Sequence, residues 1–443
     1  MTPDFLEGLL AQAKRAGADT AEAVIAESQS LSVGVRLGAL EEVERSESRD
    51  LGLRVFVGKR QATVAGSNLS PEAVARLVER AVAMARLAPE DKYAGLAPAE
   101  LIARGPFPDL DIFDPSQPTA EALEAHALEI EDAARAVTGV TNSEGGSASW
   151  GTSRWLFATT EGFLGAHQTS SHSTYASIIA GDGDNMERGG EGRSVRWASD
   201  MPSLHAMGQV AGQEAVGALG ARKIKSTTAA VIFENKIAAS VISPLIGAIS
   251  GPSVARGNSF LKDKLGQPVF ARGIRLYEEP HRKRGLGSAP FDDEGLPTRD
   301  YNLIQDGVLT TFLHTMASAR QLDQKPTGHA SRSMATPPTV GTNNLTLQPG
   351  PVDLAGLLVQ ARRGLFVTSM FGPSLNANTG DWSVGVSGFW FENGQIEYPV
   401  NEVTVAGNLI DLYARMVPGA DLEFRSSTNT PSLLFDAVAI AGQ

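Results

Sequence analysis

Apolar residues in the first ninety positions recur with two different periods. Between Pro3 and Gly17 they lie three and four positions apart, which predicts an amphipathic helix that ends at the glycine. From 23 to 57 they alternate with polar residues, as in half-buried antiparallel strands. A second helical stripe starts after Ser70. We therefore predict a helix, a strand meander, and a second helix that covers one face of the sheet.

A similar succession follows a connection at 88–118 that is rich in proline and glycine. We predict a helix at about 119–137, strands at 139–160 and 163–180, a tip at 181–185, a return strand near 193–198 and a helix near 204–221. The two successions together predict an N-terminal domain at 1–225, with two similar sub-lobes at about 1–90 and 118–222.

The second half of the chain has a different pattern. A short apolar strand at 229–233 precedes a wide apolar stripe at 237–249, which predicts a largely buried helix. From 266 onward short strands alternate with turns, and the dipeptides Asp306-Gly307 and Asn393-Gly394 are typical of two-residue hairpins. The predicted fold class is α+β, with a two-lobed N-terminal half of antiparallel strands and helices and a strand-rich C-terminal domain at 226–443.

Charge and composition narrow the class of function. Acidic residues outnumber lysine and arginine by 50 to 38, and this net charge of −12 disfavours direct binding of nucleic acid. The chain has no cysteine, which excludes disulfides and cysteine-bound metals. No apolar stretch is long enough to cross a membrane, and the acidic N-terminus does not have the pattern of a signal peptide. We expect a cytoplasmic protein without a membrane partner.

The seven histidines form no recognisable metal motif. No His-Glu-x-x-His sequence occurs, and no two histidines are four positions apart. His167 and His172 lie five apart in a strand pattern, so their side chains are expected on opposite faces. We expect no metal in this chain.

The densest polar segment is Phe291-Asp292-Asp293-Glu294-Gly295. Three consecutive acids before a glycine are compatible with a metal site, a general-base pair or a structural turn. Adjacent acids on a strand or turn diverge, so a single ion rarely binds all three. The residues alone leave these alternatives open.

A second segment combines small and polar residues. Asn376, Asn378, Gly380 and Asp381 lie close together, and Trp390 follows them. So many small residues allow another backbone to approach closely, as in β-augmentation, but they also suit a tight hairpin. Both alternatives remain open.

Together these segments resemble the TldD/PmbA family, also known as modulators of gyrase. The resemblance rests on the acidic segment at 291–295, the NANTGD segment at 376–381, the GFWFENG segment at 388–394, and the stretch 399–409. It covers most of the chain and is strongest over 225–443. It adds Asn393, Gly394 and Asn408 to Asp292, Asp293, Glu294, Gly295, Asn376, Asn378, Gly380, Asp381 and Trp390 as candidate residues for binding a peptide or a partner.

The resemblance implies a two-part zinc peptidase. Its TldD-type subunit carries a His-Glu-x-x-x-His helix and a cysteine ligand near the C-terminus, which together with a bound water form a hydrolytic site. In this chain Ser243, Pro244 and Ala248 stand at the positions of the motif, and the cysteine is missing. The pattern resembles the PmbA, or TldE, subunit type, which lacks the metal site. Zinc is then expected in the partner subunit.

The resemblance therefore implies a non-catalytic subunit that helps enclose and present small or unfolded peptides to a TldD-type zinc peptidase. One alternative is a regulatory protein-binding module that acts on gyrase or on a toxin–antitoxin pair. Another is a stand-alone hydrolase that uses Asp292, Asp293 and Glu294. The expected partner is the TldD-type subunit in a heterodimer, and a homodimer of the isolated chain remains open.

Aromatic residues on one predicted strand indicate where a partner would bind. Trp382, Phe389, Trp390 and Phe391 cannot all point to the same side of an alternating strand. We expect part of this group to face a subunit interface of about 2,000 Å² or more.

Overall fold

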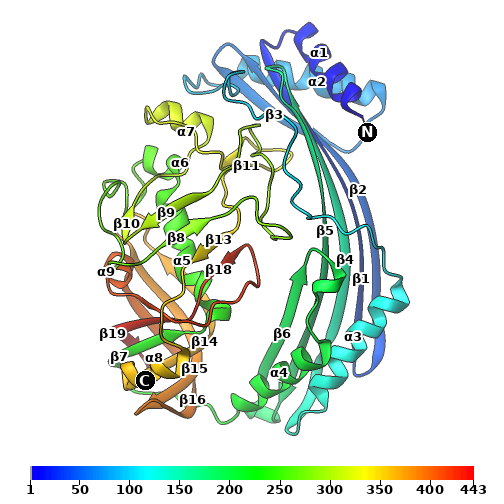
Figure 1. Cartoon of the computed structure of the whole chain (residues 1–443). Helices are drawn as coiled ribbons and strands as arrows, with labels where there is room; N and C mark the ends of the chain where they lie inside the picture. Colours follow the sequence, from blue (N-terminus) through cyan, green and yellow to red (C-terminus); the bar gives the residue numbers. More distant parts are fainter. Residues whose placement is uncertain (1) are drawn as a thin grey trace.

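Strands from both predicted sub-lobes join in one antiparallel sheet in the structure, a computed structural model that describes residues 2–443. The sheet order is β3-β2-β1-β4-β5-β6 (Figure 1). The strands are β1 (Thr20–Arg36), β2 (Ala39–Val57), β3 (Arg60–Gly66), β4 (Val140–Thr159), β5 (Leu164–Ala180) and β6 (Glu187–Val195). The central pair, β1 and β4, runs antiparallel from Glu22↔Thr159 to Val35↔Gly146 and so connects the two sub-lobes.

Each sub-lobe has the same order of elements, a helix, three strands and a helix. The helices are α1 (Pro3–Arg15), α2 (Pro71–Leu87), α3 (Ala120–Arg135) and α4 (Leu204–Gly217). Two short 3₁₀ turns, η1 (Gly183–Asn185) and η2 (Ala198–Asp200), flank β6. This repetition gives the sheet an approximate two-fold arrangement about β1 and β4, without any evident repeat in the sequence.

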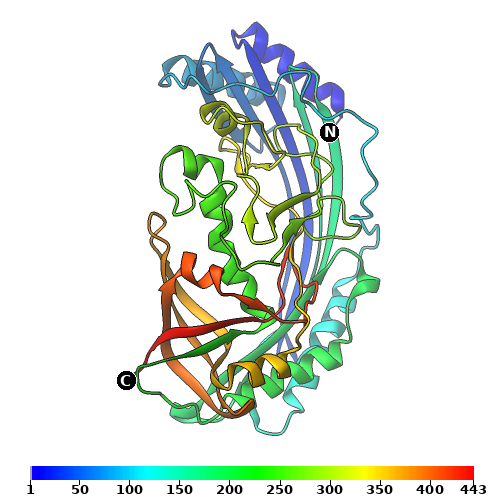
Figure 2. The same ribbon diagram turned by 60° about the vertical axis from the view of Figure 1, so that its left-hand side comes forward.

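The two faces of this sheet are covered differently. We call the face that carries the four helices the outer face and the face turned toward the C-terminal half the inner face (Figures 1 and 2). On the outer face, alternating apolar residues of β1, β2 and β4 pack against α1 and α2, and Val33, Val35, Ala148 and Trp150 pack beside α3. On the inner face, Val24 and Phe157 pack in one cluster with Phe291 and Met334 of the C-terminal half.

Most of the predicted elements of the first half are confirmed, and β6 differs. Strand β6 begins at Glu187, not near 193, and pairs with β5 from Ala180↔Glu187 to His172↔Val195. Its glycines disfavour a strand locally. Tertiary pairing with the long strand β5 overrides that preference.

The C-terminal half contains a second six-stranded sheet in the order β16-β15-β14-β7-β19-β17. Its strands are β7 (Thr227–Phe233), β14 (Arg363–Leu375), β15 (Asp381–Glu392), β16 (Gln395–Asn408), β17 (Val417–Pro418) and β19 (Leu433–Ala441). A smaller sheet contains β8 (Leu276–Glu278), β9 (Tyr301–Gln305), β10 (Val308–Leu309), β13 (Leu345–Leu347) and β18 (Thr428–Asn429), and β11 (Ala330–Ser331) pairs with β12 (Thr339–Val340). The helices are α5 (Asn235–Ile249), α6 (Gly251–Ala255), α7 (Met316–Gln321), α8 (Leu354–Ala361) and α9 (Leu409–Ala414). The fold class is thus α+β, as predicted.

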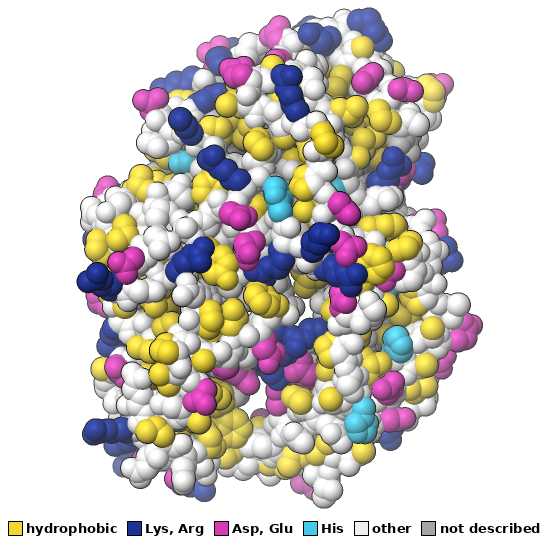
Figure 3. All heavy atoms as spheres, in the orientation of Figure 1, with side chains coloured by type: hydrophobic (Ala, Val, Ile, Leu, Met, Phe, Trp, Pro, Cys, Tyr) yellow, Lys and Arg dark blue, Asp and Glu magenta, His cyan; other side chains and the backbone are white. Residues whose placement is uncertain are grey.

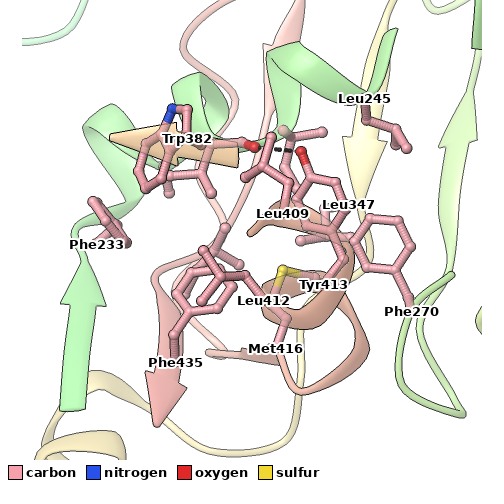
Figure 4. Packing of buried hydrophobic residues seen from close by; sticks show 14 of the residues in the cluster. Phe233, Leu245, Phe270, Leu347, Trp382, Leu409, Leu412, Tyr413, Met416 and Phe435 are labelled. Atoms are coloured by element: carbon pink, nitrogen blue, oxygen red, sulfur yellow. Dashed lines mark hydrogen bonds between the residues drawn. The ribbon is translucent and has the colours of Figure 1, made fainter. Parts of the chain in front are cut away.

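Helix α5 lies between the two sheets of this half and forms the centre of the largest core. Leu245 of α5, Phe270, Tyr413 and Phe435 belong to this cluster (Figure 4). The rings of Phe270 and Tyr413 stack with centroids 4.7 Å apart, and the Tyr413 hydroxyl donates to the carbonyl of Val241 at 2.8 Å. The core therefore holds α5 in place even though the helix contains an interior proline, a residue that weakens an isolated helix by about 3 kcal/mol.

Both predicted two-residue turns are confirmed. Asp306 and Gly307 have φ values of 50° and 79° and connect β9 to β10, and Asn393 and Gly394 have φ values of 53° and 78° and connect β15 to β16. Positive φ at both central residues is the geometry that hairpins of this length prefer. Among the described residues, none of the helices combines the length and apolar character needed to cross a bilayer.

Part of the aromatic group of β15 was predicted to face a subunit interface, and three of its four members are buried within this chain. Trp382 and Trp390 are 4% exposed and belong to the core around α5, and Phe391 is fully buried beside α8. Phe389 alone is half-buried. Both faces of β15 pack against other elements of this chain, and the alternation of the strand could not reveal that.

Candidate functional site

The acidic segment lies where the C-terminal half packs on the inner face of the N-terminal sheet. An isolated bridge between Phe291 and Pro297 closes the turn that contains the three acids. The ring of Phe291 contacts those of Phe163 and Phe107, with centroids 5.0 and 4.9 Å away. A Cβ on Gly295 would lie 2.7 Å from the ring of Phe163, and φ here is +78°, so the position requires glycine.

Two of the three acids are buried and hydrogen-bonded to the backbone. The Asp292 carboxylate accepts from the N–H groups of Glu294 (2.9 Å), Leu296 (2.8 Å) and Ala330 (3.0 Å). The Glu294 carboxylate accepts from the N–H of Met316 at 2.7 Å. Burial, reinforced by the charge of Glu294, raises the pKa of Asp292 well above its usual range, and burial raises the pKa of Glu294 to about 7. These two residues organise the turn, which is one of the three alternatives that the sequence left open.

Asp293 has a different environment. It is half-buried, its carboxylate accepts from the N–H of Arg332 at 2.9 Å, and burial raises its pKa to about 6. It lines a cavity of about 260 Å³ together with Asp292, Trp155, His167, His329 and Arg332. Asp293 is therefore the member of the acidic segment that a small ligand could contact.

The two histidines of this cavity have different environments. His329 Nε2 lies 2.5 Å from a carboxylate oxygen of Glu278, and both side chains are buried. Burial, with a smaller effect of Arg196, lowers the pKa of His167 to about 4, so this imidazole is neutral at pH 7. Across the described residues 2–443, no three His, Asp or Glu side chains come together in a way that would hold a metal ion.

The raised pKa of Glu294 predicts a pH dependence of stability. A carboxyl whose pKa is raised by folding binds its proton more tightly in the folded state, so its contribution is present below the unfolded pKa and is lost as pH rises through the folded value. Urea unfolding at about pH 5 and about pH 8 should show that Glu294→Gln loses less stability with rising pH than the unaltered chain. The exposed Glu129→Gln on α3 is the matched control, and an equal pH response of all three proteins would contradict the prediction.

The positions of the zinc motif lie on α5. Ser243 is exposed and its hydroxyl donates to the carbonyl of Ala239 at 3.0 Å, whereas Ala248 is 4% exposed and packs in the core. Pro244 between them has no group that binds a metal. These residues do not fit a zinc ion, and their side chains do not converge on a common point.

The NANTGD segment forms a tight hairpin turn between β14 and β15. Asn376 and Asp381 are joined by a backbone hydrogen bond of 2.8 Å, and Gly380 donates to the carbonyl of Asn376 at 2.8 Å. Asn378 donates its N–H to the Asn376 side chain at 3.0 Å, and Asn408 from β16 donates to the Asp381 carboxylate at 3.0 Å. Hydrogen bonds from Thr379 and Asn408 lower the pKa of Asp381. The hairpin interpretation accounts for all of these contacts.

The candidate residues therefore occupy three separate places. Asp292, Asp293, Glu294 and Gly295 are together at the contact between the halves. Asn376, Asn378, Gly380, Asp381 and Asn408 are together at one end of β15. Trp390, Asn393 and Gly394 are at its other end, where the buried Trp390 indole donates to Glu392 at 3.1 Å.

A buried ion network beside the acidic segment was not predicted. Glu22 of β1 contacts Arg54 of β2 at 3.1 Å and Arg332 of the C-terminal half at 2.7 Å, and all three side chains are at most 3% exposed. A charged residue between Ala21 and Ala23 on a buried strand is an unusual feature that could have indicated it. Its second partner, Arg332, is more than 300 positions away in the chain and could not be inferred from spacing.

The two halves also border a larger interdomain groove of about 770 Å³. It separates Tyr175, Ser177 and Arg188 of the N-terminal sheet from Phe366, Thr368, Ser387 and Phe389 of the C-terminal sheet. Beside it, Lys236 of α5 pairs with Glu191 and Glu214, and Arg425 also contacts Glu191. Burial and the neighbouring acids Glu214 and Glu191 raise the pKa of Glu234, which lines the groove, to about 7. Figure 3 shows this part of the molecule hollowed between the two halves, with acidic and basic side chains beside the opening.

Comparisons with known proteins agree with this architecture along nearly the whole chain. Three family models match: PmbA/TldA metallopeptidase domain 1 at 21–85, the central domain at 113–219 and the C-terminal domain at 226–442. The metalloprotease PmbA of Escherichia coli O157:H7 is 36% identical over 427 residues, which cover 96% of this chain and 93% of that protein.

Solved structures have the same fold. A proposed modulator of DNA gyrase from Bacteroides thetaiotaomicron superposes with a TM-score of 0.92 at 25% identity and covers 99% of this chain and 98% of its own. TldE from Thermococcus kodakarensis superposes with a TM-score of 0.88 at 21% identity and covers 99% of this chain and 100% of its own. The chain therefore has the three successive domains of a metallopeptidase family. The chain belongs to the PmbA/TldD metallopeptidase family.

Proposed function

We propose that this chain is the non-catalytic partner subunit of a PmbA/TldD-type zinc metallopeptidase. The observation that carries the proposal is helix α5, where Ser243, Pro244 and Ala248 occupy the motif positions of the zinc-binding subunit. Hydrolysis of an amide at neutral pH requires an activated water or nucleophile. The described residues of this chain contain no group of side chains that would hold the metal for that purpose.

The role that remains for this subunit is to enclose and position the substrate. The fold and the core around α5 are intact although the motif positions carry no metal ligands. This favours a role in which the subunit assembles with its partner and shapes the substrate site. The groove between the halves, about 770 Å³, has room for an extended peptide segment. In the complex, zinc and the reacting water belong to the partner subunit.

The test is to express this chain with the family member of the same organism that carries His-Glu-x-x-x-His. We expect each protein alone to leave an unfolded peptide uncleaved or slowly cleaved, and the co-purified complex to cleave it. Asp293→Asn is the variant that separates this proposal from the stand-alone hydrolase, because Asp293 lines a cavity and is the least buried of the three acids. Cleavage by the purified single chain that Asp293→Asn abolishes would overturn the proposal. A chain that binds gyrase but not the peptidase would favour the regulatory alternative.

A further inference from the structure

The inner face of the N-terminal sheet is lined by hydroxyl side chains. Strand register places Ser28, Ser30 and Ser32 of β1 opposite Ser48 and Ser46 of β2 on one side and Ser153 and Ser149 of β4 on the other. The same rows continue across β5 and β6 with Thr169, Ser171, Ser173 and Ser194. Ser28 and Ser48 are hydrogen-bonded at 2.8 Å, and Ser173 and Ser194 at 2.7 Å, so the hydroxyls form rows across the strands.

This hydroxyl surface remains open to solvent in the single chain. Ser30 and Ser46 are exposed, and Ser149, Ser153 and Ser171 are half-buried. The C-terminal half covers the inner face at the end of the sheet beyond these rows, where Met334 packs on Gly52 and Phe291 on Gly165. The surface is therefore closed at that end by the acidic segment and its cavity. The C-terminal half also contacts the edge at β6, where Arg196 donates to the carbonyls of Gly285 and Leu286.

At its other end the hydroxyl surface is continuous with the interdomain groove. Ser147 and Tyr175 pair across β4 and β5 in the next row, and Ser177 follows with Gly190. Tyr175, Ser177 and Gly190 all line the groove. The groove itself is lined in part by Tyr175, Phe366 and Phe389. An extended chain that leaves the groove can continue along the serine rows, whose inward side chains are hydroxyl groups, glycine and one glutamate.

The edge of this surface along β2 is acidic. Glu42, Glu44 and Asp50 of β2 lie on the inner face, opposite Gly34, Ser32 and Ala26 of β1. The arginines of the same strand, Arg45 and Arg49, pair with Leu31 and Glu27 and point to the outer face. A bound segment with lysine or arginine side chains would find opposite charge along one edge.

We propose that the serine-lined inner face binds extended, cationic polypeptide segments through their main chain. This inference rests on the proposed function and assigns to it the surface that holds the substrate. A serine hydroxyl rotates to donate or to accept, so it pairs with main-chain N–H and C=O groups whatever the side chains are. The serine rows offer no apolar side chain that would retain a hydrophobic segment, which lets an unfolded chain move along them. The acidic edge contributes attraction that weakens with salt.

The absence of cysteine from the chain makes a direct test possible, because single cysteines can be placed on either face. Ser30→Cys and Gln29→Cys are exposed neighbours on β1, and Ser153→Cys and Thr152→Cys are half-buried neighbours on β4; the first of each pair points inward and the second outward. Each variant is labelled with a maleimide photo-crosslinker and irradiated with an unstructured fluorescent peptide of glycine, serine and lysine. Thermal unfolding of each labelled variant confirms that it is folded.

At low salt we expect about tenfold more crosslinked peptide from each inward variant than from its outward neighbour. The amount of peptide crosslinked to the inward variants should fall in ~1 M salt, where the screening length is about 3 Å. It should also fall when glutamate replaces lysine in the peptide. Three results would overturn the inference. They are equal crosslinking on both faces, inward crosslinking that is independent of peptide charge and salt, and stronger crosslinking with an uncharged oligosaccharide probe. The assay uses this chain alone, so its outcome is independent of peptidase activity. If the inward variants do not crosslink but the complex cleaves peptide, only this inference fails. If they crosslink but the complex does not cleave, only the proposed function fails.

Discussion

Replacement of Glu22 by alanine is expected to lower the free energy of unfolding by about 3–5 kcal/mol. Glu22 is 1% exposed and contacts two guanidinium groups, those of Arg54 and Arg332, which are themselves buried. Its removal leaves both positive charges in a low-dielectric environment without the carboxylate that they contact directly. Because Arg332 belongs to the C-terminal half, the loss should also loosen the contact between the halves.

Urea unfolding followed by tryptophan fluorescence measures this effect. Glu47→Ala is the matched control, because Glu47 pairs with Arg45 at the surface, where both side chains are more than half exposed. Such a pair contributes about 0–1 kcal/mol. Glu22→Gln should fall between the two variants, since it keeps an acceptor but loses the charge. If Glu22→Ala unfolds at the same urea concentration as Glu47→Ala, the buried network does not stabilise the contact between the halves.

Replacement of Asp292 by alanine is expected to destabilise the chain by about 3 kcal/mol or more, since each buried donor left unpaired costs about 1–3 kcal/mol. The Asp292 carboxylate accepts from three backbone N–H groups, those of Glu294, Leu296 and Ala330. Asp292→Asn retains the oxygen that pairs with two of them if the amide is oriented accordingly, so its loss should be smaller. Asp436→Ala, at an exposed position of β19, is the control and should leave stability nearly unchanged.

Asp292→Asn also distinguishes a structural role of the acidic segment from a catalytic role. In the complex with the peptidase partner, activity of Asp292→Asn per folded molecule should equal that of the unaltered protein. Loss of cleavage by a fully folded and assembled Asp292→Asn complex would show that Asp292 takes part in the reaction, contrary to the geometry described above.

The local sequence pattern predicted an element correctly where residues close to one another in the chain determine its structure. The spacing of Leu6, Leu9, Leu10 and Ala13 predicts α1, because a helix brings residues three and four apart onto one face. The Asn393-Gly394 dipeptide predicts its hairpin because both residues tolerate positive φ. Strand β6 was misplaced because its glycines carry little local preference, and its pairing with β5 came from the tertiary fold.

The candidate site could be predicted only in part. The sequence singled out Asp292 and Glu294 as unusual, but their hydrogen bonds run to Ala330 and Met316, far along the chain, and these decide that they organise a turn. Trp390 was a candidate for binding a peptide or a partner, and the packing around α5 buries it. No rule of spacing identifies which elements will cover each face of a strand.

The sequence by itself determined most elements of the first half, the two sharp hairpins and the absence of cysteine, because these depend on residue type and on neighbours within a few positions. It also determined that α5 carries no metal-binding side chain at Ser243, Pro244 and Ala248. Only the tertiary structure decided that both sub-lobes share one sheet, that Glu22 pairs with Arg332, and that serines from five strands lie on one open face. Those features require contacts between residues tens to hundreds of positions apart, which form only when the whole chain buries its apolar surface.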